Sequence, residues 1–286
     1  MGLYELTERL EKLTGVDPLA SRLADVVGKV VPPGAAKDAL SGTWLGHSLH
    51  PVLSDLPIGT WTSAALLDLF GGEESAKAAE ILVGIGILSS LPTAASGASD
   101  WADTQGGERR VGLVHALTNT AALGLLGGSY SARRRGNQRL GVLLGLVGTS
   151  VATASAYLGG HLTMGLGVGS NQTAFEDGFT EWTSVADAGS LSDGTPTKVT
   201  RNGTQLVLVK QGDRLHGLSS RCSHLGGPLE EGDIDGRTIT CPWHASTFDL
   251  EDGSVVKGPA RCPQPAYEVR ERDGRIEARL RESVRA

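Results

Sequence analysis

Four residues near the C-terminus have the types and the spacing of ligands for an iron–sulfur centre. Cys222 is followed by His224, and after a spacer of 16 residues Cys241 is followed by His244. Two thiolates can bind one iron of a [2Fe–2S] cluster and two neutral imidazoles the other, which makes the cluster easier to reduce than one held by four thiolates. Zinc sites also combine Cys with His, but they rarely interleave them in this way. The spacing therefore predicts a carrier of single electrons.

The sequence around these ligands resembles the Rieske [2Fe–2S] family over roughly residues 180–280. The likeness is closest to the ferredoxin-type branch, through the run Cys-Pro-Trp-His-Ala-Ser-Thr-Phe-Asp-Leu-Glu-Asp-Gly-Ser-Val-Val-Lys-Gly-Pro-Ala that begins at Cys241. The resemblance implies an all-β domain in which Cys222, His224, Cys241 and His244 bind the two irons of a [2Fe–2S] cluster.

Departures from the high-potential members of the family indicate a low reduction potential. Rieske proteins of cytochrome bc complexes add two cysteines that join the ligand loops by a disulfide, and the resemblance places Gly227 and Trp243 at those positions. The family's serine that donates to a bridging sulfide is retained as Ser246, whereas the tyrosine that donates to a ligand sulfur is replaced by Phe248. Fewer donors to sulfur favour the oxidised state. We therefore expect a potential in the lower part of the Rieske range, which spans roughly −150 to +300 mV.

Two further residues of reactive type are predicted to be structural. Cys262 lies outside both ligand pairs and has no cysteine left to pair with, because the other two are ligands. A small buried residue is its expected role, with a redox-active thiol as the alternative. His216 lies in a Leu-His-Gly-Leu strand pattern and is expected to be structural as well.

Length and composition predict a second unit ahead of the cluster domain. The chain has 286 residues and a net charge of −6, which argues against nucleic acid as a partner. Its mean hydropathy of −0.08 averages over four apolar stretches, at about residues 52–70, 79–98, 111–129 and 140–158. Each stretch is close to the roughly 20 residues that a membrane-spanning helix needs.

The composition of these stretches favours a membrane bundle over its alternative, a soluble four-helix bundle. Gly, Ala, Ser and Thr replace many larger apolar residues, and small side chains let helices pack closely in lipid. The second and fourth stretches contain no charged residue except Glu80 near one end. A lipid membrane is therefore an expected partner.

The helical part resembles a bacterial family of four-helix membrane proteins known as domain of unknown function 2231, over roughly residues 44–169. The likeness lies in the run Gly-His-Ser-Leu-His-Pro-Val-Leu-Ser-Asp-Leu-Pro-Ile-Gly-Thr-Trp from Gly46, and continues in Asp68, Asp100-Trp101, His115 with Asn119, and Gly159-Gly160-His161-Leu162. It implies a membrane topology and no established chemistry.

The sequence therefore predicts that the chain has four parts. Residues 1–43 form an N-terminal amphipathic helical segment, residues 44–169 an all-α four-helix transmembrane bundle, residues 170–180 a linker and residues 181–286 an all-β Rieske domain. The N-terminal segment has acidic and basic residues throughout and lacks the pattern of a signal peptide. It would lie on the bilayer or on the bundle, with a solvated surface helix as the alternative.

Three histidines of the helical part are predicted to lie at one membrane face. His50 precedes the first helix, His115 lies near the start of the third and His161 follows the fourth. They suit a second redox site, either a haem b held by a pair such as His115 and His161 or a quinone pocket in which His and Asp accept protons. The alternative is that these histidines only cap helices and bond to loops.

Two functions are compatible with this organisation. In the first, the chain transfers single electrons from a haem or quinol site at that face to a redox protein that docks on the Rieske domain. In the second, the Rieske domain is a ferredoxin-like electron donor to an oxygenase or reductase and the helices serve only as an anchor. Both make the chain a component of an oxidoreductase system rather than a stand-alone enzyme, and no residue is assigned a catalytic role.

The loop between the third and fourth helices indicates the orientation in the membrane. It contains Arg133-Arg134-Arg135 and Arg139, and the positive-inside rule places such a loop in the cytoplasm. The Rieske domain of this multi-pass protein of the bacterial cell membrane would then be extracytoplasmic. The paired arginines loosely match the signal that the twin-arginine route reads.

Overall fold

The computed structural model describes residues 2–281, which divide into two units. The helical unit is drawn from the residues up to Val31 and from Leu49–Val168. The second unit is drawn from Pro32–Ser48 and from the residues from Gly169 onward, so a short N-terminal segment belongs with the C-terminal domain.

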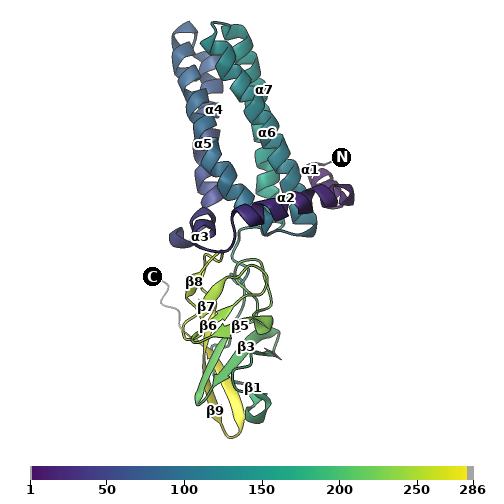
Figure 1. Ribbon diagram of the computed structural model, residues 1–286, viewed down its shortest axis with the longest axis vertical. Coiled ribbons are helices and arrows are strands. Elements are labelled where there is room, and N and C mark those ends of the chain that lie inside the picture. Colours follow the sequence, from purple (N-terminus) through teal and green to yellow (C-terminus); the bar gives the residue numbers. More distant parts are fainter. Residues whose placement is uncertain (1, 282–286) are drawn as a thin grey trace. The chain divides into compact units, whose positions relative to one another are not determined.

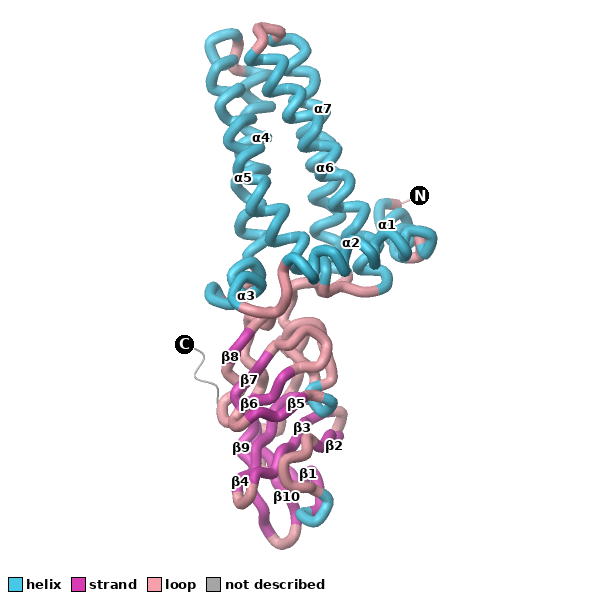
Figure 2. The backbone as a smooth tube through the Cα atoms, viewed as in Figure 1, coloured by secondary structure: helices cyan, strands magenta, loops and turns pink. Residues whose placement is uncertain are grey.

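Four long helices make up most of the helical unit (Figures 1 and 2). They are α4 (Leu49–Phe70), α5 (Ala76–Ala102), α6 (Gly106–Arg134) and α7 (Gln138–Gly160), preceded by α1 (Leu3–Glu11) and α2 (Asp17–Val30). The predicted apolar stretches each lie inside one of the long helices, so the helical prediction is confirmed. By length and composition, three helices of the described residues could cross a membrane: α5, α6 and α7, with the turns next to α5 and α7 included.

Small residues fill the centre of this unit. Ala64, Ala79, Ala122 and Ala152 are buried with Trp61, Val83 and Leu126, one or more from each long helix. Small side chains at the crossings allow the backbones to approach closely. The small residues that make these stretches less hydrophobic are therefore the residues that allow the helices to pack closely.

Pro57 interrupts the hydrogen bonds of α4, and α5 compensates for the loss. Because proline has no N–H, the carbonyl of Leu53 loses the donor four residues later. The hydroxyl of Thr93 on α5 lies 3.1 Å from that carbonyl and shares its one proton with the carbonyl of Ser89 at 2.9 Å. In an apolar environment a neighbouring hydroxyl of this kind is what makes a helix-internal proline tolerable.

The second helix directs its small side chains inward. Ala20 and Ala24 are buried, whereas Leu19, Val26 and Val30 are exposed. Arg110 of α6 fixes this region by donating to Asp17 at 2.6 Å and to the carbonyl of Glu11 at 2.6 Å. Exposed apolar side chains along a helix, such as these, are typical of a helix that lies in a membrane interface.

The sequence predicts that Arg133 is part of an exposed basic loop, but in the structure its side chain is buried. It lies in the last turn of α6, its side chain is 0% exposed, and it forms an ion pair with Asp68 of α4, whose side chain is 2% exposed. Its Nη1 donates to Asp68 Oδ1 at 2.8 Å, and its Nε donates to Ser129 Oγ at 3.2 Å. In this loop, Arg134, Arg135 and Arg139 remain as the positive charges to which the positive-inside rule applies. The orientation of the protein in the membrane stays a prediction.

The second unit contains two antiparallel sheets, which confirms the β prediction (Figure 2). The larger sheet has, in spatial order, β1 (Thr183–Asp187), β10 (Arg275–Leu280), β9 (Ala266–Arg272), β4 (Arg214–Ser219), β3 (Thr204–Gln211) and β2 (Thr197–Arg201). The smaller sheet has β5 (Asp233–Asp235), β6 (Thr238–Thr240), β7 (Thr247–Asp249) and β8 (Val255–Lys257). The segment Pro32–Ser48 contributes α3 (Ala35–Ser41).

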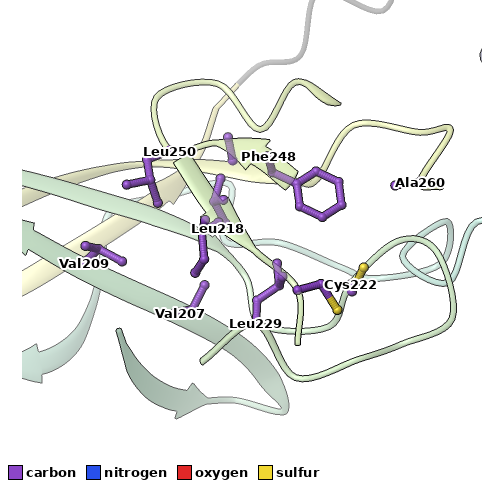
Figure 3. Close-up of a cluster of buried hydrophobic side chains, with 11 residues drawn as sticks. Val207, Val209, Leu218, Cys222, Leu229, Phe248, Leu250 and Ala260 are labelled. Carbon is purple, nitrogen blue, oxygen red and sulfur yellow. The ribbon is translucent and has the colours of Figure 1, made fainter. Parts of the chain in front are cut away.

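A buried apolar cluster joins the two sheets (Figure 3). Val207, Leu218 and Ala266 come from the larger sheet, and Ile239 and Phe248 from the smaller one. In β3, Val207 and Val209 point to this core, whereas Leu206 and Leu208 lie in other buried clusters, because successive side chains of a strand point to opposite faces. The same cluster includes the two buried cysteines.

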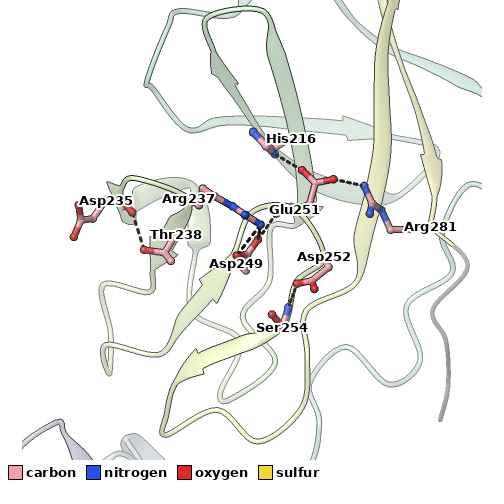
Figure 4. A network of polar contacts seen from close by, with 9 residues as sticks. All are labelled: His216, Asp235, Arg237, Thr238, Asp249, Glu251, Asp252, Ser254 and Arg281. Carbon is pink, nitrogen blue, oxygen red and sulfur yellow. Dashed lines mark hydrogen bonds and ion pairs between the residues drawn. The ribbon is translucent and has the colours of Figure 1, made fainter.

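A polar network reinforces the join between the sheets (Figure 4). Glu251, in the turn after β7, accepts a hydrogen bond from Arg281 at 2.9 Å and lies 3.8 Å from Nδ1 of His216 on β4. Arg237 and Asp249 pair across the smaller sheet at 3.2 Å. His216 thus has a structural place, as its strand pattern predicts.

Residues 170–180, predicted to be a linker, are bonded to the β domain. Gln172 N donates to the carbonyl of Ser223 at 3.0 Å, and the carbonyl of Phe179 accepts from Leu280 N at 2.7 Å. Ser219 Oγ donates to Glu176 at 2.5 Å. These bonds make the segment part of the domain.

Candidate metal centre

Two tight loops position the four candidate ligands. The loop after β4 carries Cys222 and His224, and Cys222 N donates to the carbonyl of Gly227 at 2.8 Å. The loop between β6 and β7 carries Cys241 and His244, and Cys241 N donates to the carbonyl of Ser246 at 2.8 Å. Each cysteine is thus fixed by its own backbone at the base of a turn.

The two sulfurs are buried side by side in the apolar cluster. Cys222 is 1% exposed and Cys241 is 2% exposed, and the two thiols hydrogen-bond to each other. This bond, together with burial, raises the pKa of Cys222 well above its ordinary value, whereas the bond from Cys222 lowers the pKa of Cys241 to about 7. The pair therefore releases its first proton near neutral pH and holds the second, which a bound metal would have to displace.

The two imidazoles form the other half of the donor set. The rings of His224 and His244 meet edge to face with centroids 5.1 Å apart, and a nitrogen of each ring lies within 4.8 Å of a nitrogen of the other. Burial, followed by the neighbouring His244, holds the pKa of His224 well below its ordinary value. His224 is therefore neutral, which is the form that binds metal.

The geometry around Gly227 agrees with the position that the resemblance gave it. A Cβ atom at residue 227 would lie 2.7 Å from Cys241 Sγ and 3.2 Å from the ring of Trp243. Positions 227 and 243 therefore face each other, as expected of two positions that a disulfide joins in other members. In this chain glycine leaves room for the sulfur and the indole.

Ser246 and Phe248 are both buried close to the second pair of candidate ligands. Ser246 is fully buried, and its Oγ accepts from Ala260 N at 3.0 Å, so its own proton is still available to donate. Phe248 is 0% exposed and packs in the cluster that contains both sulfurs. A phenylalanine there offers no donor to sulfur.

Gln264 is a supporting residue that sequence reasoning missed. It is 2% exposed, its Oε1 accepts from Ser223 N at 3.0 Å, and its Nε2 donates to the carbonyl of Ser219 at 2.9 Å. It thereby fixes the first ligand loop from a distance of about 40 residues in sequence. Its place between two prolines, Pro263 and Pro265, marks an irregular segment, but no spacing signals the contact.

Cys262 lies beside the first ligand loop, where its carbonyl accepts from Ser223 Oγ at 2.8 Å. Burial raises the pKa of its thiol. The residue is only partly buried, so the prediction of a small buried residue holds in part.

The helical unit brings two of its three candidate histidines together. The rings of His50 and His115 meet edge to face with centroids 6.4 Å apart. His50 Nδ1 lies 2.9 Å from the carbonyl of Thr93, and His115 Nδ1 lies 2.8 Å from the carbonyl of Ser155. With α4, α5, α6 and α7 each contributing one group, this is a polar contact shared by all four long helices.

His161 has different partners. Its Nε2 lies 2.9 Å from Glu11 Oε1, and its ring meets that of Tyr4 at 6.1 Å. His115 meanwhile uses its second nitrogen in a contact of 3.1 Å with the amide of Asn119. A haem held between His115 and His161 gains no support from this arrangement, because both rings are already engaged by the protein.

A two-sheet domain whose adjacent loops present two buried sulfurs and two imidazoles defines an iron–sulfur protein of the mixed-ligand kind. The chain belongs to the Rieske [2Fe–2S] family, whose domain description matches residues 181–268. Residues 46–172 match a second family, described as a predicted membrane protein, DUF2231. Both resemblances seen in the sequence are confirmed.

Characterised relatives match the C-terminal third. The ferredoxin CarAc of Metapseudomonas resinovorans is 30% identical over 96 residues, which are 33% of this chain and 90% of the ferredoxin. The oxygenase component of a 3-ketosteroid-9-alpha-monooxygenase of Rhodococcus rhodochrous is 40% identical over 100 residues, 35% of this chain and 24% of that protein. The iron–sulfur subunit of a cytochrome b6-f complex of Chlorobaculum tepidum is 32% identical over 92 residues, 32% of this chain and 50% of the subunit. The chain thus spans most of the ferredoxin and half or less of the other two.

Proposed function

We propose that this chain is a membrane-anchored Rieske protein in which Cys222, His224, Cys241 and His244 hold a [2Fe–2S] cluster. The observation that carries the proposal is the convergence of two buried sulfurs and two neighbouring imidazoles from two loops. Thiolate and neutral imidazole are the donors that a Rieske cluster takes, and a bound cluster supplies one-electron oxidation and reduction.

The protein's own contribution is to hold the donors and keep water from the sulfurs. The apolar cluster around Phe248 buries both cysteines, and Ser246 keeps a hydroxyl proton inside the loop. Trp243, within the second ligand loop, is 50% exposed and presents an aromatic surface to a docking protein.

The helical unit anchors this domain in a bilayer with four spans. Besides the three helices that qualify by composition, α4 is 22 residues long and exposes Val52, Leu56, Leu66 and Leu69. Apolar side chains that point away from a helical bundle are expected where lipid replaces water. The Arg134, Arg135 and Arg139 loop would face the cytoplasm, which leaves the Rieske domain outside.

The partner is a redox protein that exchanges single electrons with the Rieske domain, in the manner of a ferredoxin. One relative, of which the chain covers 90%, is named a ferredoxin. In this function the helices are an anchor that keeps the carrier at the membrane.

A second candidate is electron delivery by a quinol in the helical unit. The contact of His50 Nδ1 with the Thr93 carbonyl requires an N–H at Nδ1, which leaves Nε2 as the nitrogen that could accept a proton. An acceptor nitrogen suits removal of a quinol proton.

Purified full-length protein in detergent tests the proposal and separates its two forms. We expect the absorption and electron paramagnetic resonance spectra of a Rieske cluster. Reduction of the cluster by an added quinol, lost in His50→Ala, would establish the second candidate. Reduction by a ferredoxin reductase but not by quinol would establish the anchored carrier, and the absence of any iron–sulfur spectrum would refute both.

Replacing Phe248 with tyrosine should raise the midpoint potential of the cluster. The family's tyrosine at this position donates to a ligand sulfur, and such a bond is stronger in the more negative reduced state. A difference of about 1 kcal/mol corresponds to roughly 40 mV for a one-electron couple. Redox titration followed by circular dichroism measures it, and Ser246→Ala should shift the potential downward. An unchanged potential in Phe248→Tyr would show that another feature sets it.

A further inference from the structure

A third loop, residues 258–262, is bonded to both of the loops that carry the candidate ligands. Ala260 N donates to Ser246 Oγ, in the second ligand loop, at 3.0 Å. The carbonyl of Cys262 accepts from Ser223 Oγ, in the first ligand loop, at 2.8 Å. Ala260 is also fully buried in the apolar cluster that contains the two candidate sulfurs. A displacement of the third loop would therefore disturb both ligand loops.

The N-terminal segment Pro32–Ser48 is bonded to this third loop, although it lies far outside the residues that match the Rieske family. The carbonyl of Ser41, at the end of α3, accepts from Arg261 Nε at 2.5 Å across 220 residues of sequence. Ser48 Oγ donates to the carbonyl of Gly169 at 3.1 Å. The segment is thus attached to the β domain in two places.

Gly258 allows the segment to reach the third loop. A Cβ atom at Gly258 would lie 2.2 Å from Thr43 Oγ1 and 2.7 Å from Asp38 Oδ1. Both oxygens are shielded from water, so the fit is tight. A methyl group at position 258 would have to displace either the segment or the third loop.

We propose that the segment Pro32–Ser48 positions the metal centre by holding the third loop against both ligand loops. Gly258 and Arg261 are the positioning residues, because the first permits the close approach and the second forms the bond. Through Ala260 N, the third loop holds the oxygen of Ser246, whose proton remains available to cluster sulfur. The inference rests on the proposed binding of a [2Fe–2S] cluster.

Redox titration of full-length Gly258→Ala tests this role. Because the added methyl group displaces Ala260 N, we expect the midpoint potential to fall, by no more than it falls in Ser246→Ala. The double variant Gly258→Ala with Ser246→Ala should match Ser246→Ala alone, since the loop acts through that hydroxyl. Gly189→Ala, where an added Cβ atom meets open space, should leave the potential unchanged. Additive shifts in the double variant would overturn positioning through Ser246.

Arg261→Lys provides a second variant if Gly258→Ala does not load a cluster. Lysine keeps the positive charge but has a methylene group where arginine has Nε, so the bond to the Ser41 carbonyl is lost. The potential should fall here too. Arg201→Lys, the same change at an exposed position of β2, should leave it unchanged.

Hydrogen exchange of the same full-length proteins gives a readout that does not depend on the potential. In Gly258→Ala and Arg261→Lys, the amides of residues 219–228 and 241–247 should exchange about fivefold faster, the effect of losing roughly one hydrogen bond. Gly189→Ala should exchange as the wild type does. Potentials and exchange rates that both match the wild type would overturn the role of the segment. Absence of a cluster from the wild type would instead refute the proposed function, and exchange would still test the positioning of the ligand loops.

Discussion

Replacing Cys241 with alanine will abolish the iron–sulfur spectrum of this protein. Cys241 and Cys222 hydrogen-bond to each other, and together they supply the two thiolates of the donor set. Cys241 is also only 2% exposed, so water could not readily replace its sulfur as a ligand. Loss of one thiolate from a site with two leaves one iron without a full set of donors. Iron and sulfide content, together with the visible spectrum, measure the result.

Matched controls separate this effect from a general loss of folding. Cys262→Ala removes the cysteine outside the ligand set and should retain full cluster content. His115→Ala alters the helical unit and should retain it too. His224→Ala should behave like Cys241→Ala. A full cluster in Cys241→Ala, or its loss in Cys262→Ala, would contradict the ligand assignment.

Replacing Asp68 with alanine should give the largest loss of stability among single changes in the helical unit. Arg133 would keep a buried guanidinium without its carboxylate partner, since both side chains are almost fully shielded. Breaking a buried ion pair by removing one partner costs about 3–5 kcal/mol. Unfolding of the purified protein in mixed micelles, as the fraction of denaturing detergent rises, measures the loss.

The double variant Asp68→Leu with Arg133→Met is the informative control. Replacing a buried pair with apolar residues of similar size is often neutral, so most of the stability should return. Glu8→Ala, which removes an exposed pair with Lys12 at 3.7 Å, should cost less than about 1 kcal/mol. A double variant as unstable as Asp68→Ala would show that the charge pair is not the cause.

The features that could be predicted from the sequence are those with a local or periodic signal. The four apolar stretches fall inside α4 to α7 because helix length and apolar composition both follow from the chain segment itself. The ligand loops could be found because Cys-x-His and Cys-x-x-His place donors within single turns. Even the facing positions of Gly227 and Trp243 followed from the family resemblance.

The features that could not be predicted depend on contacts between distant segments. The sequence around Arg133 predicts a loop residue. Nothing in that sequence indicates that Asp68, 65 residues earlier, lies beside it. His161 was grouped with His115 by its place at a helix end, but Glu11, 150 residues away, is its partner. Gln264 has no motif either. Tertiary packing decides such positions, and it leaves no periodic pattern in one sequence.

The division of the chain into two units has a consequence for the order in which they can be completed. The segment Pro32–Ser48 belongs with the residues from Gly169 onward, although the 120 residues of Leu49–Val168 lie between them in sequence. Because a chain is synthesised from its N-terminus, α3 is made long before the strands of its own unit, and that unit is complete only after the whole helical segment has been made.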